Sequence, residues 1–197
     1  MVRKQLEQSV ATITAVLNDA QIHAAVLEAG RVTAEAMRAG RKLMVCGNGG
    51  SAADAQHLVA EFVVRLTVDR PALRAIALTT DSSILTAAGN DYGYDAVFER
   101  QVEALGTKGD VLLAISTSGN SKNCVRALKL ARAMGIHTVS YTGNAGGAMK
   151  EWSDINVIVP SKVTMNIQES HLALEHIFCM VVERCYFGPG FGGEAAK

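Results

Sequence analysis

Short apolar runs alternate with longer amphipathic stretches along most of the chain. The apolar runs predict five strands, over residues 43–46, 74–79, 111–115, 138–141 and 156–159. The stretches between and after them predict helices, over residues 51–66, 82–88, 94–104, 121–134 and 167–186. Strands that alternate with helices pair in parallel and are covered on both faces. The pattern therefore predicts an α/β protein whose ligand site lies at the carboxyl ends of the strands.

The N-terminal part of the chain lies outside this alternation. Residues 3–39 are predicted to be helical, with one break near residues 18–21 and a stop at Gly40, and they make up most of an N-terminal arm. A chain of 197 residues suits one domain, so residues 1–187 are expected to form a single domain that includes the arm, residues 1–39. Residues 188–197 are rich in glycine and are expected to be a flexible tail.

The predicted helix over residues 167–186 is apolar on nearly all its faces. A helix of this kind is buried in a core or between subunits. Its polar side chains therefore need partners, because burying a polar group without one is unfavourable. These side chains are Gln168, Glu169, His171, Glu175 and His176. Periodicity does not decide which of them share a site.

Composition excludes several classes of partner. Lys and Arg together number 19, as do Asp and Glu, so no net charge favours nucleic acid or an anionic membrane. The N-terminus is too polar for a signal peptide, and the longest apolar run, residues 177–182, is too short to span a bilayer. The cysteines have neither C-x-x-C nor zinc-ribbon spacing; they are Cys46, Cys124, Cys179 and Cys185. We therefore expect a cytoplasmic protein with reduced, mostly buried thiols and with neither nucleic acid nor membrane as a partner.

The most informative segment is a glycine turn between a predicted strand and a predicted helix. The turn, Gly47-Asn48-Gly49-Gly50-Ser51, follows the strand over residues 43–46, and the helix that it opens carries His57 and Glu61. Glycine lets the backbone approach a ligand, and the first N–H groups of a helix are free to bind an anion. Their spacing places His57 and Glu61 on one helical face, about 6 Å apart along the axis.

The His57 and Glu61 pair has two interpretations. At this spacing, a His and a Glu often make only a helix-surface contact worth a few tenths of a kcal/mol. However, the pair follows an anion-binding turn on the same helix, and imidazole plus carboxylate suits a borderline metal such as zinc. Two further ligands from elsewhere in the chain would complete a four-coordinate site.

A second loop with phosphate-binding character follows the predicted strand over residues 111–115. The loop, Ser116-Thr117-Ser118-Gly119-Asn120-Ser121, places four hydroxyl groups and one glycine at the start of a helix. Ser, Asn and Gly are also ordinary cap and turn residues, and for either loop alone that plainer interpretation is slightly favoured. Both loops follow parallel strands at the edge where α/β proteins bind ligands, and together they favour a phosphate site.

Three other patterns carry less weight. Gly47-x-Gly49-x-x-Ala52 matches the dinucleotide fingerprint, with Asp69 roughly 20 residues further on. Asp69 stands before the second predicted strand rather than at its end, so a nucleotide cofactor is disfavoured. Asp81 is predicted to cap the helix that follows it, and Gly89-Asn90-Asp91 is most simply a turn after that helix.

Taken together, these motifs resemble those of the phosphoheptose isomerases, which belong to the larger group of sugar-isomerase (SIS) domain proteins. The resemblance covers roughly residues 40–187, and it depends on the order and spacing of several passages. They are Gly47 to His57, Ala77-Leu-Thr-Thr-Asp81, Gly89-Asn-Asp-Tyr92, Ser116-Thr-Ser-Gly-Asn-Ser121, and Ile167-Gln-Glu-Ser-His171 with His176. The resemblance implies a three-layer α/β/α sandwich with a five-stranded parallel, flavodoxin-like sheet. It also implies a homotetramer whose sites are built between subunits.

By position, the resemblance implies roles for individual residues. The implied zinc ligands, for one ion per subunit, are His57, Glu61, Gln168 and His176. The implied phosphate-binding residues are Ser51, Ser116, Thr117, Ser118 and Ser121. The rest of the substrate site would be lined by Asn48, Gly49, Gly50, Glu61, Asn90, Asp91 and Gln168.

The implied reaction moves a proton between C1 and C2 of sedoheptulose 7-phosphate through an enediol(ate). Its product is D-glycero-D-manno-heptose 7-phosphate, a precursor of ADP-heptose for lipopolysaccharide or other surface glycans. The chemistry needs a base at carbon, a proton carrier between the oxygens and a stabiliser of the oxyanion. We assign acid–base work to Glu61 and His176, with zinc polarising the carbonyl. Because a carboxylate bound to a cation is a weaker base, Glu61 would have to loosen its metal bond during turnover.

Two alternatives share this fold. Some SIS-domain relatives are non-catalytic regulators, including one that binds the replication initiator and keeps a similar glycine loop. Those regulators lack the glutamate and the late histidine, whereas this chain has both Glu61 and His176, which favours the enzyme. The other alternative is an isomerase for a ketose phosphate of another length, because the sequence does not measure the sugar.

Overall fold

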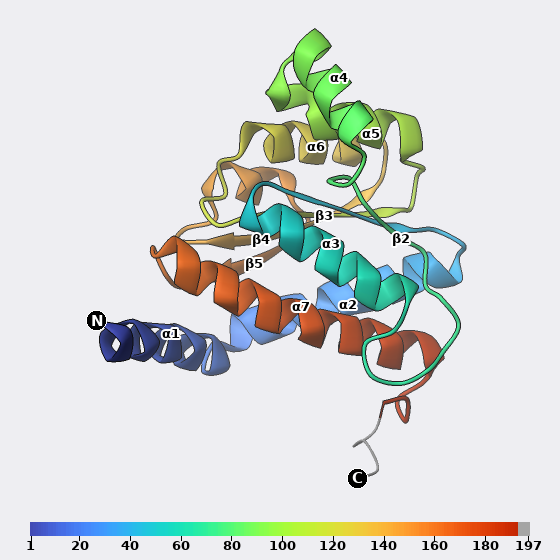
Figure 1. The fold of residues 1–197 in the computed structure, drawn as a ribbon. Helices are drawn as coiled ribbons and strands as arrows, with labels where there is room; N and C mark the ends of the chain where they lie inside the picture. Colours follow the sequence, from blue (N-terminus) through green and yellow to red (C-terminus); the bar gives the residue numbers. More distant parts are fainter. Residues whose placement is uncertain (193–197) are drawn as a thin grey trace.

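A computed structural model describes residues 1–192 of the chain and shows a five-stranded parallel sheet between two layers of helices (Figure 1). The strands are β1 (Leu43–Gly47), β2 (Ala75–Ala77), β3 (Val111–Ser116), β4 (His137–Gly143) and β5 (Ile155–Val159). The α-helices are α1 (Val2–Leu17), α2 (Ala20–Arg38), α3 (Gly50–Val63), α4 (Ser82–Tyr92), α5 (Val97–Leu105), α6 (Lys122–Ala133) and α7 (Thr164–Phe187). Two 3₁₀ helices, η1 (Tyr94–Ala96) and η2 (Gly147–Trp152), complete the described elements. The predicted α/β/α sandwich is confirmed.

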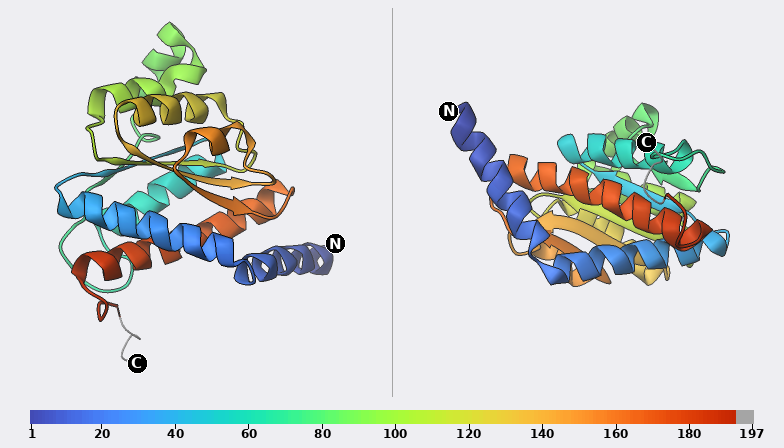
Figure 2. Two further views of the ribbon diagram at one scale, coloured as in Figure 1. Left: turned by 180° about the vertical axis from the view of Figure 1, so that it is seen from behind. Right: turned by 90° about the horizontal axis from the view of Figure 1, so that it is seen from below.

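Each face of the sheet has its own hydrophobic core. Along β1, Leu43 and Val45 point into the core formed with α2, α3 and α7, whereas Met44 and Cys46 point into the core formed with α5 and α6. This alternation follows from the two-residue period of a strand. Both sets of side chains are buried because helices cover both faces of the sheet (Figure 2).

The strand order places the two predicted anion loops side by side. The order is β2-β1-β3-β4-β5, so the chain reverses its direction of winding between β1 and β3. Gly47, at the end of β1, lies opposite Ile115, which is the residue before Ser116 at the end of β3. The carboxyl ends of strands at such a switch point form the crevice where open α/β sheets bind ligands.

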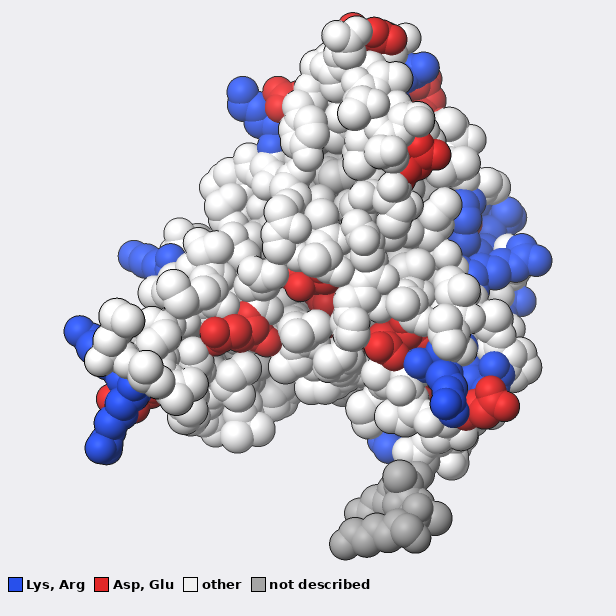
Figure 3. Space-filling view, viewed as in Figure 1, with Lys and Arg blue, Asp and Glu red and all other residues white. Residues whose placement is uncertain are grey.

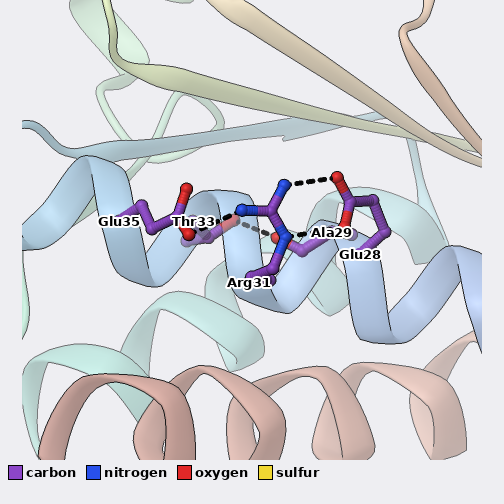
Figure 4. Close-up of polar contacts among 5 residues, drawn as sticks. All are labelled: Glu28, Ala29, Arg31, Thr33 and Glu35. Carbon is purple, nitrogen blue, oxygen red and sulfur yellow. Dashed lines mark hydrogen bonds and ion pairs between the residues drawn. The ribbon is translucent and has the colours of Figure 1, made fainter.

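The N-terminal arm consists of two helices, as predicted, and they meet at an angle of 71°. Helix α2 packs along α7 beneath the sheet, and α1 projects past the sheet's edge (Figure 2). The outer face of α2 carries an exposed ion triplet in which Arg31 pairs with Glu28 and Glu35 (Figure 4). Within residues 1–192, no single helix combines the length and apolar character of a bilayer span; α1 and α2 meet those criteria only as a bent pair, by length and composition alone.

Several predicted boundaries are wrong, chiefly around α4. This helix continues to Tyr92, so Asn90 and Asp91 lie in its last turn and not in a separate turn after residue 88. Gly93, with φ +84°, ends the helix in a conformation that side chains disfavour. The helix predicted over residues 94–104 divides into η1 and α5.

Two more boundaries differ from the prediction. The edge strand β2 is only three residues long, and α3 ends at Val63 instead of continuing to residue 66. The predicted N-cap at Asp81 is confirmed, because its carboxylate accepts a hydrogen bond from the Ile84 N–H. The predicted flexible tail falls partly outside the described residues, which end at 192, and it stays a prediction.

A cluster of buried polar side chains lies between β4, α3 and α7. His171 is fully buried and donates from Nε2 to the Thr142 carbonyl oxygen at 3.0 Å. Burial lowers the pKa of His171 to about 4, although the bond to the Thr142 carbonyl opposes that shift. Burial raises the pKa of Glu175 to about 8, with Asp54 adding to the effect. This part of the core therefore favours a neutral imidazole and a neutral carboxyl group.

We predict that His171 makes the protein less stable in mild acid. Below about pH 6.5 the unfolded chain binds a proton on this imidazole, whereas the folded chain stays unprotonated down to about pH 4. The free energy of unfolding should therefore fall as the pH falls through this window, by up to about 3 kcal/mol from this group. Urea unfolding of the native protein and His171→Gln, from about pH 7 to about pH 4.5, measures the difference between their pH slopes.

A matched control is His137→Gln, because His137 is exposed at the amino end of β4. It should follow the native slope, and only His171→Gln should flatten it. Equal slopes in all three proteins would contradict the assignment.

Candidate active site at the carboxyl edge of the sheet

The glycine turn after β1 has a backbone that other residues could not adopt without strain. Gly49 has φ +57° and ψ −121°, a conformation open mainly to glycine. At Gly50, a Cβ atom would lie 2.3 Å from Nε2 of Gln168, so the lack of a side chain lets α7 approach. No side chain caps the start of α3, which leaves the N–H groups of Gly50 and Ser51 free for an anion. The predicted anion loop is therefore well formed.

The second loop gathers hydroxyl groups beside the first. Ser116 Oγ lies 2.9 Å from Ser121 Oγ and 3.4 Å from Ser118 Oγ. Thr117 continues the turn, and its carbonyl accepts a hydrogen bond from the Gly143 N–H. Helix α6 begins directly after Ser121 and also lacks a side-chain cap. The loop thus offers hydroxyl donors and a helix N-terminus at one place.

His57, Glu61 and His176 form one side-chain cluster between α3 and α7. His57 Nε2 lies 2.8 Å from His176 Nε2 and 3.6 Å from Glu61 Oε1. One potential ligand atom from each residue lies within 4.8 Å of the others. Ligand atoms around a four-coordinate zinc ion are about 3.3 Å apart, given bonds of about 2.0–2.1 Å. Two imidazoles and a carboxylate at this spacing fit a borderline divalent metal ion.

Gln168, the fourth predicted ligand, lies elsewhere on α7. Its Nε2 donates to Asp54 Oδ1 at 3.3 Å, next to the glycine turn. Two helical turns separate it from His176, which is about 12 Å along the axis. Gln168 and Asp54 line a hollow of about 270 Å³. Three of the four predicted metal ligands therefore lie together, and the fourth, Gln168, lies beside the glycine turn.

Asp54 belongs to this region, although sequence reasoning did not single it out. Partial burial raises the pKa of its carboxyl group, while the bond from Gln168 and the nearby His57 act in the opposite direction. Its Oδ2 atom has no hydrogen-bond partner among the described residues. The available signal was its position one turn before His57, on the face of α3 that meets the last helix.

Asn90 and Asp91 lie apart from the loops. They are exposed in the last turn of α4, which projects above the sheet (Figure 1), and the Asn90 amide donates to the Asp91 carboxylate at 2.8 Å. No hydrogen bond within residues 1–192 joins either side chain to the glycine turn or to the second loop. Their predicted contact with substrate stays a prediction.

The side chain of Asn48 faces α6. Its amide exchanges two hydrogen bonds with Asn123, and it accepts a third from the phenol of Tyr94. Sequence reasoning missed both partners. The available signal was slight, since Asn123 merely follows the second loop by two residues and Tyr94 merely follows Gly93.

Known proteins resemble this chain over most of its length. A family model described as "SIS domain" matches residues 7–143. A phosphoheptose isomerase of Akkermansia muciniphila is 55% identical over 161 residues, which cover 82% of this chain and 85% of that protein. A phosphoheptose isomerase of Clostridium acetobutylicum is 46% identical over 187 residues, which cover 95% of each chain.

A solved structure also resembles this chain over most of its length. The phosphoheptose isomerase GmhA from Neisseria gonorrhoeae superposes with a TM-score of 0.86 and 40% sequence identity, covering 92% of this chain and 96% of that one. With its switch-point loops and its His–Glu–His cluster, the chain belongs to the SIS-domain family and, within it, to the phosphoheptose isomerases.

Proposed function

We propose that this protein is an aldose–ketose isomerase that converts sedoheptulose 7-phosphate to D-glycero-D-manno-heptose 7-phosphate. The product would supply ADP-heptose precursors for lipopolysaccharide or other surface glycans. The observation that carries the proposal is the His57, Glu61 and His176 cluster on the two helices that border the anion loops. A regulator that only binds its partner needs no such group of acids and bases, so the regulator reading is not favoured.

The two loops would hold the substrate by its phosphate. The proposed phosphate ligands are Ser51, Ser116, Thr117, Ser118 and Ser121, together with the first N–H groups of α3. The remaining contacts with the sugar are proposed for Asn48, Gly49, Gly50, Glu61, Asn90, Asp91 and Gln168. The neighbouring positions of the loops support this arrangement, because both follow strands at the switch point of the sheet.

Glu61 and His176 are the proposed acid–base residues. The reaction removes a proton from one carbon, returns it to the neighbouring carbon and shifts a proton between the two oxygens. His57 Nε2 lies 2.8 Å from His176 Nε2 and 3.6 Å from Glu61 Oε1, so both proposed acid–base residues belong to one side-chain cluster. Imidazole and carboxylate groups are the side chains that most often transfer protons as general acids and bases.

We predict that Glu61→Gln lowers kcat on sedoheptulose 7-phosphate by about 100-fold or more, because the amide keeps the shape of the side chain but cannot accept the proton. An isomerase assay with purified protein measures the effect. Glu103→Gln is the matched control, since Glu103 is exposed on α5 and, within residues 1–192, pairs only with Arg100. Full activity in Glu61→Gln would overturn the proposed mechanism.

We also propose one zinc ion per subunit as the resident metal. His57, Glu61 and His176 would hold the ion, with Gln168 as the proposed fourth ligand. The ion would supply Lewis-acid polarisation of the substrate carbonyl. The donor set supports zinc, because imidazole nitrogen and carboxylate oxygen are its usual ligands alongside thiolate.

Metal analysis tests this directly. The gently purified protein should contain about one zinc per chain, and His57→Ala should lose most of it. A chelator should remove both the metal and the activity, and added zinc should restore them. His137→Ala is the control, because this exposed histidine lies at the opposite end of the sheet. Equal metal content in both variants would contradict the proposed ligand set.

We propose further that the protein assembles as a homotetramer with sites at subunit interfaces. Large apolar side chains are exposed along α1 and α7; they are Val2, Leu6, Val10, Ile13, Leu17, Leu172, Ile177 and Met180. An apolar groove of about 290 Å³ runs between α1, α2 and α7. The middle of the face over α3 and α7 is largely uncharged, with isolated acidic patches, and Lys and Arg gather at its right-hand end (Figure 3). Contiguous apolar surface of this kind favours association with other copies of the chain.

We predict that replacing Leu6 and Val10 by Lys disrupts the assembly without unfolding the chain. Both side chains are more than 60% exposed in the single chain, so their loss leaves its core intact. Light scattering during size exclusion should show a tetramer for the native protein and smaller species for the double variant. Leu105→Lys, an exposed apolar position on α5, is the control and should stay tetrameric. A monomeric native protein would contradict the proposal.

Two further proposals concern the chain as a whole. We propose that residues 1–187 act as a single domain, which the packing of α2 against both β5 and α7 supports. We also propose a cytoplasmic location, which the absence of disulfides among the four cysteines supports, since all four are free thiols in the described residues.

A further inference from the structure

A small hydrogen-bonded cluster holds the glycine turn from the side of α6. Asn48 Nδ2 donates to Asn123 Oδ1 at 2.9 Å, and Asn123 Nδ2 donates back to Asn48 Oδ1 at 2.8 Å. The phenol of Tyr94 donates to the same Asn48 Oδ1 at 3.2 Å. Asn123 Oδ1 also accepts the N–H of Cys124, which fixes the plane of its amide.

These bonds occupy the side chain of Asn48. Its oxygen accepts two hydrogen bonds, and its nitrogen faces Asn123 Oδ1 and the Cys124 sulfur atom. The side chain therefore anchors the turn, and what the turn presents to a ligand is its backbone. Two antiparallel bonds between a pair of amides fix both position and orientation, which a single bond does not.

The two partners of Asn48 come from elements on either side of the site. Asn123 is buried in the first turn of α6, directly after the second anion loop. Tyr94 is exposed in η1, directly after the helix that carries Asn90 and Asp91. Within residues 1–192, the Tyr94 phenol makes the only side-chain hydrogen bond between the α4–η1 segment and the glycine turn. The cluster thus ties three parts of the candidate site together.

We propose that Tyr94 and Asn123 are positioning residues of the isomerase. They hold Asn48, and with it the backbone N–H groups of residues 49–51, in the orientation that receives the sugar phosphate. This role rests on the proposed function, and it assigns no chemistry to either residue. Its consequence is specific: loosening the anchor weakens substrate binding more than the chemical step, because His57 lies two turns further along α3, about 10 Å from the turn.

Tyr94→Phe is the most direct test, because it removes one hydroxyl group from an exposed side chain and leaves the ring. KM for sedoheptulose 7-phosphate should rise about three- to tenfold, the range for one lost hydrogen bond, while kcat stays within about twofold. Tyr92→Phe is the matched control. Tyr92 is equally exposed two residues away, contacts Arg100 through its ring, and has no bond to the turn. Its KM should equal that of the native enzyme.

A double-mutant cycle separates positioning from a general loss of structure. In an Asn48→Ala background, Tyr94→Phe should change KM no further, since its partner is already gone. Asn123→Asp keeps the acceptor for Asn48 Nδ2 but places an oxygen against Asn48 Oδ1, so it should raise KM more than Tyr94→Phe does. If Asn123→Asp does not fold, the Tyr94 cycle alone decides.

The outcomes distinguish this inference from the proposed function. A native enzyme that turns over sedoheptulose 7-phosphate, with Tyr94→Phe equal to Tyr92→Phe in KM, would overturn the positioning role and leave the function standing. Additive effects of Asn48→Ala and Tyr94→Phe would overturn it as well. A native enzyme with no isomerase activity, carrying its full metal content, would overturn the proposed function itself.

Discussion

The candidate site depends on the packing of α7 alongside α3. The two helices run in the same direction, since Gln168 lies beside Gly50 and His176 lies beside His57. Further along, Phe62 and Phe178 meet edge to face at 5.8 Å. Every pairing across the site follows from this alignment: shifting α7 by one residue would rotate each of its side chains by about 100° away from its partner.

A buried ion pair holds the C-terminal parts of α3 and α7 together. Arg70 donates from Nε to Glu183 of α7 at 2.7 Å, and it also binds the carbonyl oxygens of Glu61 and Phe62 at the end of α3. Such a pair adds little net stability over an apolar replacement, because removing two charges from water is unfavourable. Its geometry is nevertheless specific, since a planar guanidinium satisfies the end of one helix while it pairs with the other. The backbone beneath Glu61 is thereby held against the helix that supplies His176.

Local patterns were enough to predict the sandwich, the two loops and the His57–Glu61 pair. A two-residue period along β1 and an i,i+4 spacing on α3 involve neighbours in the sequence, and the fold preserves them. The position of Gln168 was not predictable in this way, because its partner Asp54 is 114 residues distant and is set by helix packing. The end of α4 was missed for a local reason. Gly89 has no positive φ, so the helix passes through it and ends at Gly93 instead.

The glycine turn shows why a sequence motif alone does not identify an activity. Gly49 adopts a positive φ that other residues disfavour, and the missing side chain of Gly50 makes room for α7. The side chain of Asn48 accepts a hydrogen bond from the Asn123 amide on α6. Each of these residue types is dictated by packing within the chain, so a protein that only binds a sugar phosphate would need the same turn. Acid–base chemistry places different demands, because two imidazoles and a carboxylate at close range offer nothing to packing. For this reason the cluster of His57, Glu61 and His176, and not the loop that precedes it, distinguishes an isomerase from a binding protein on the same fold.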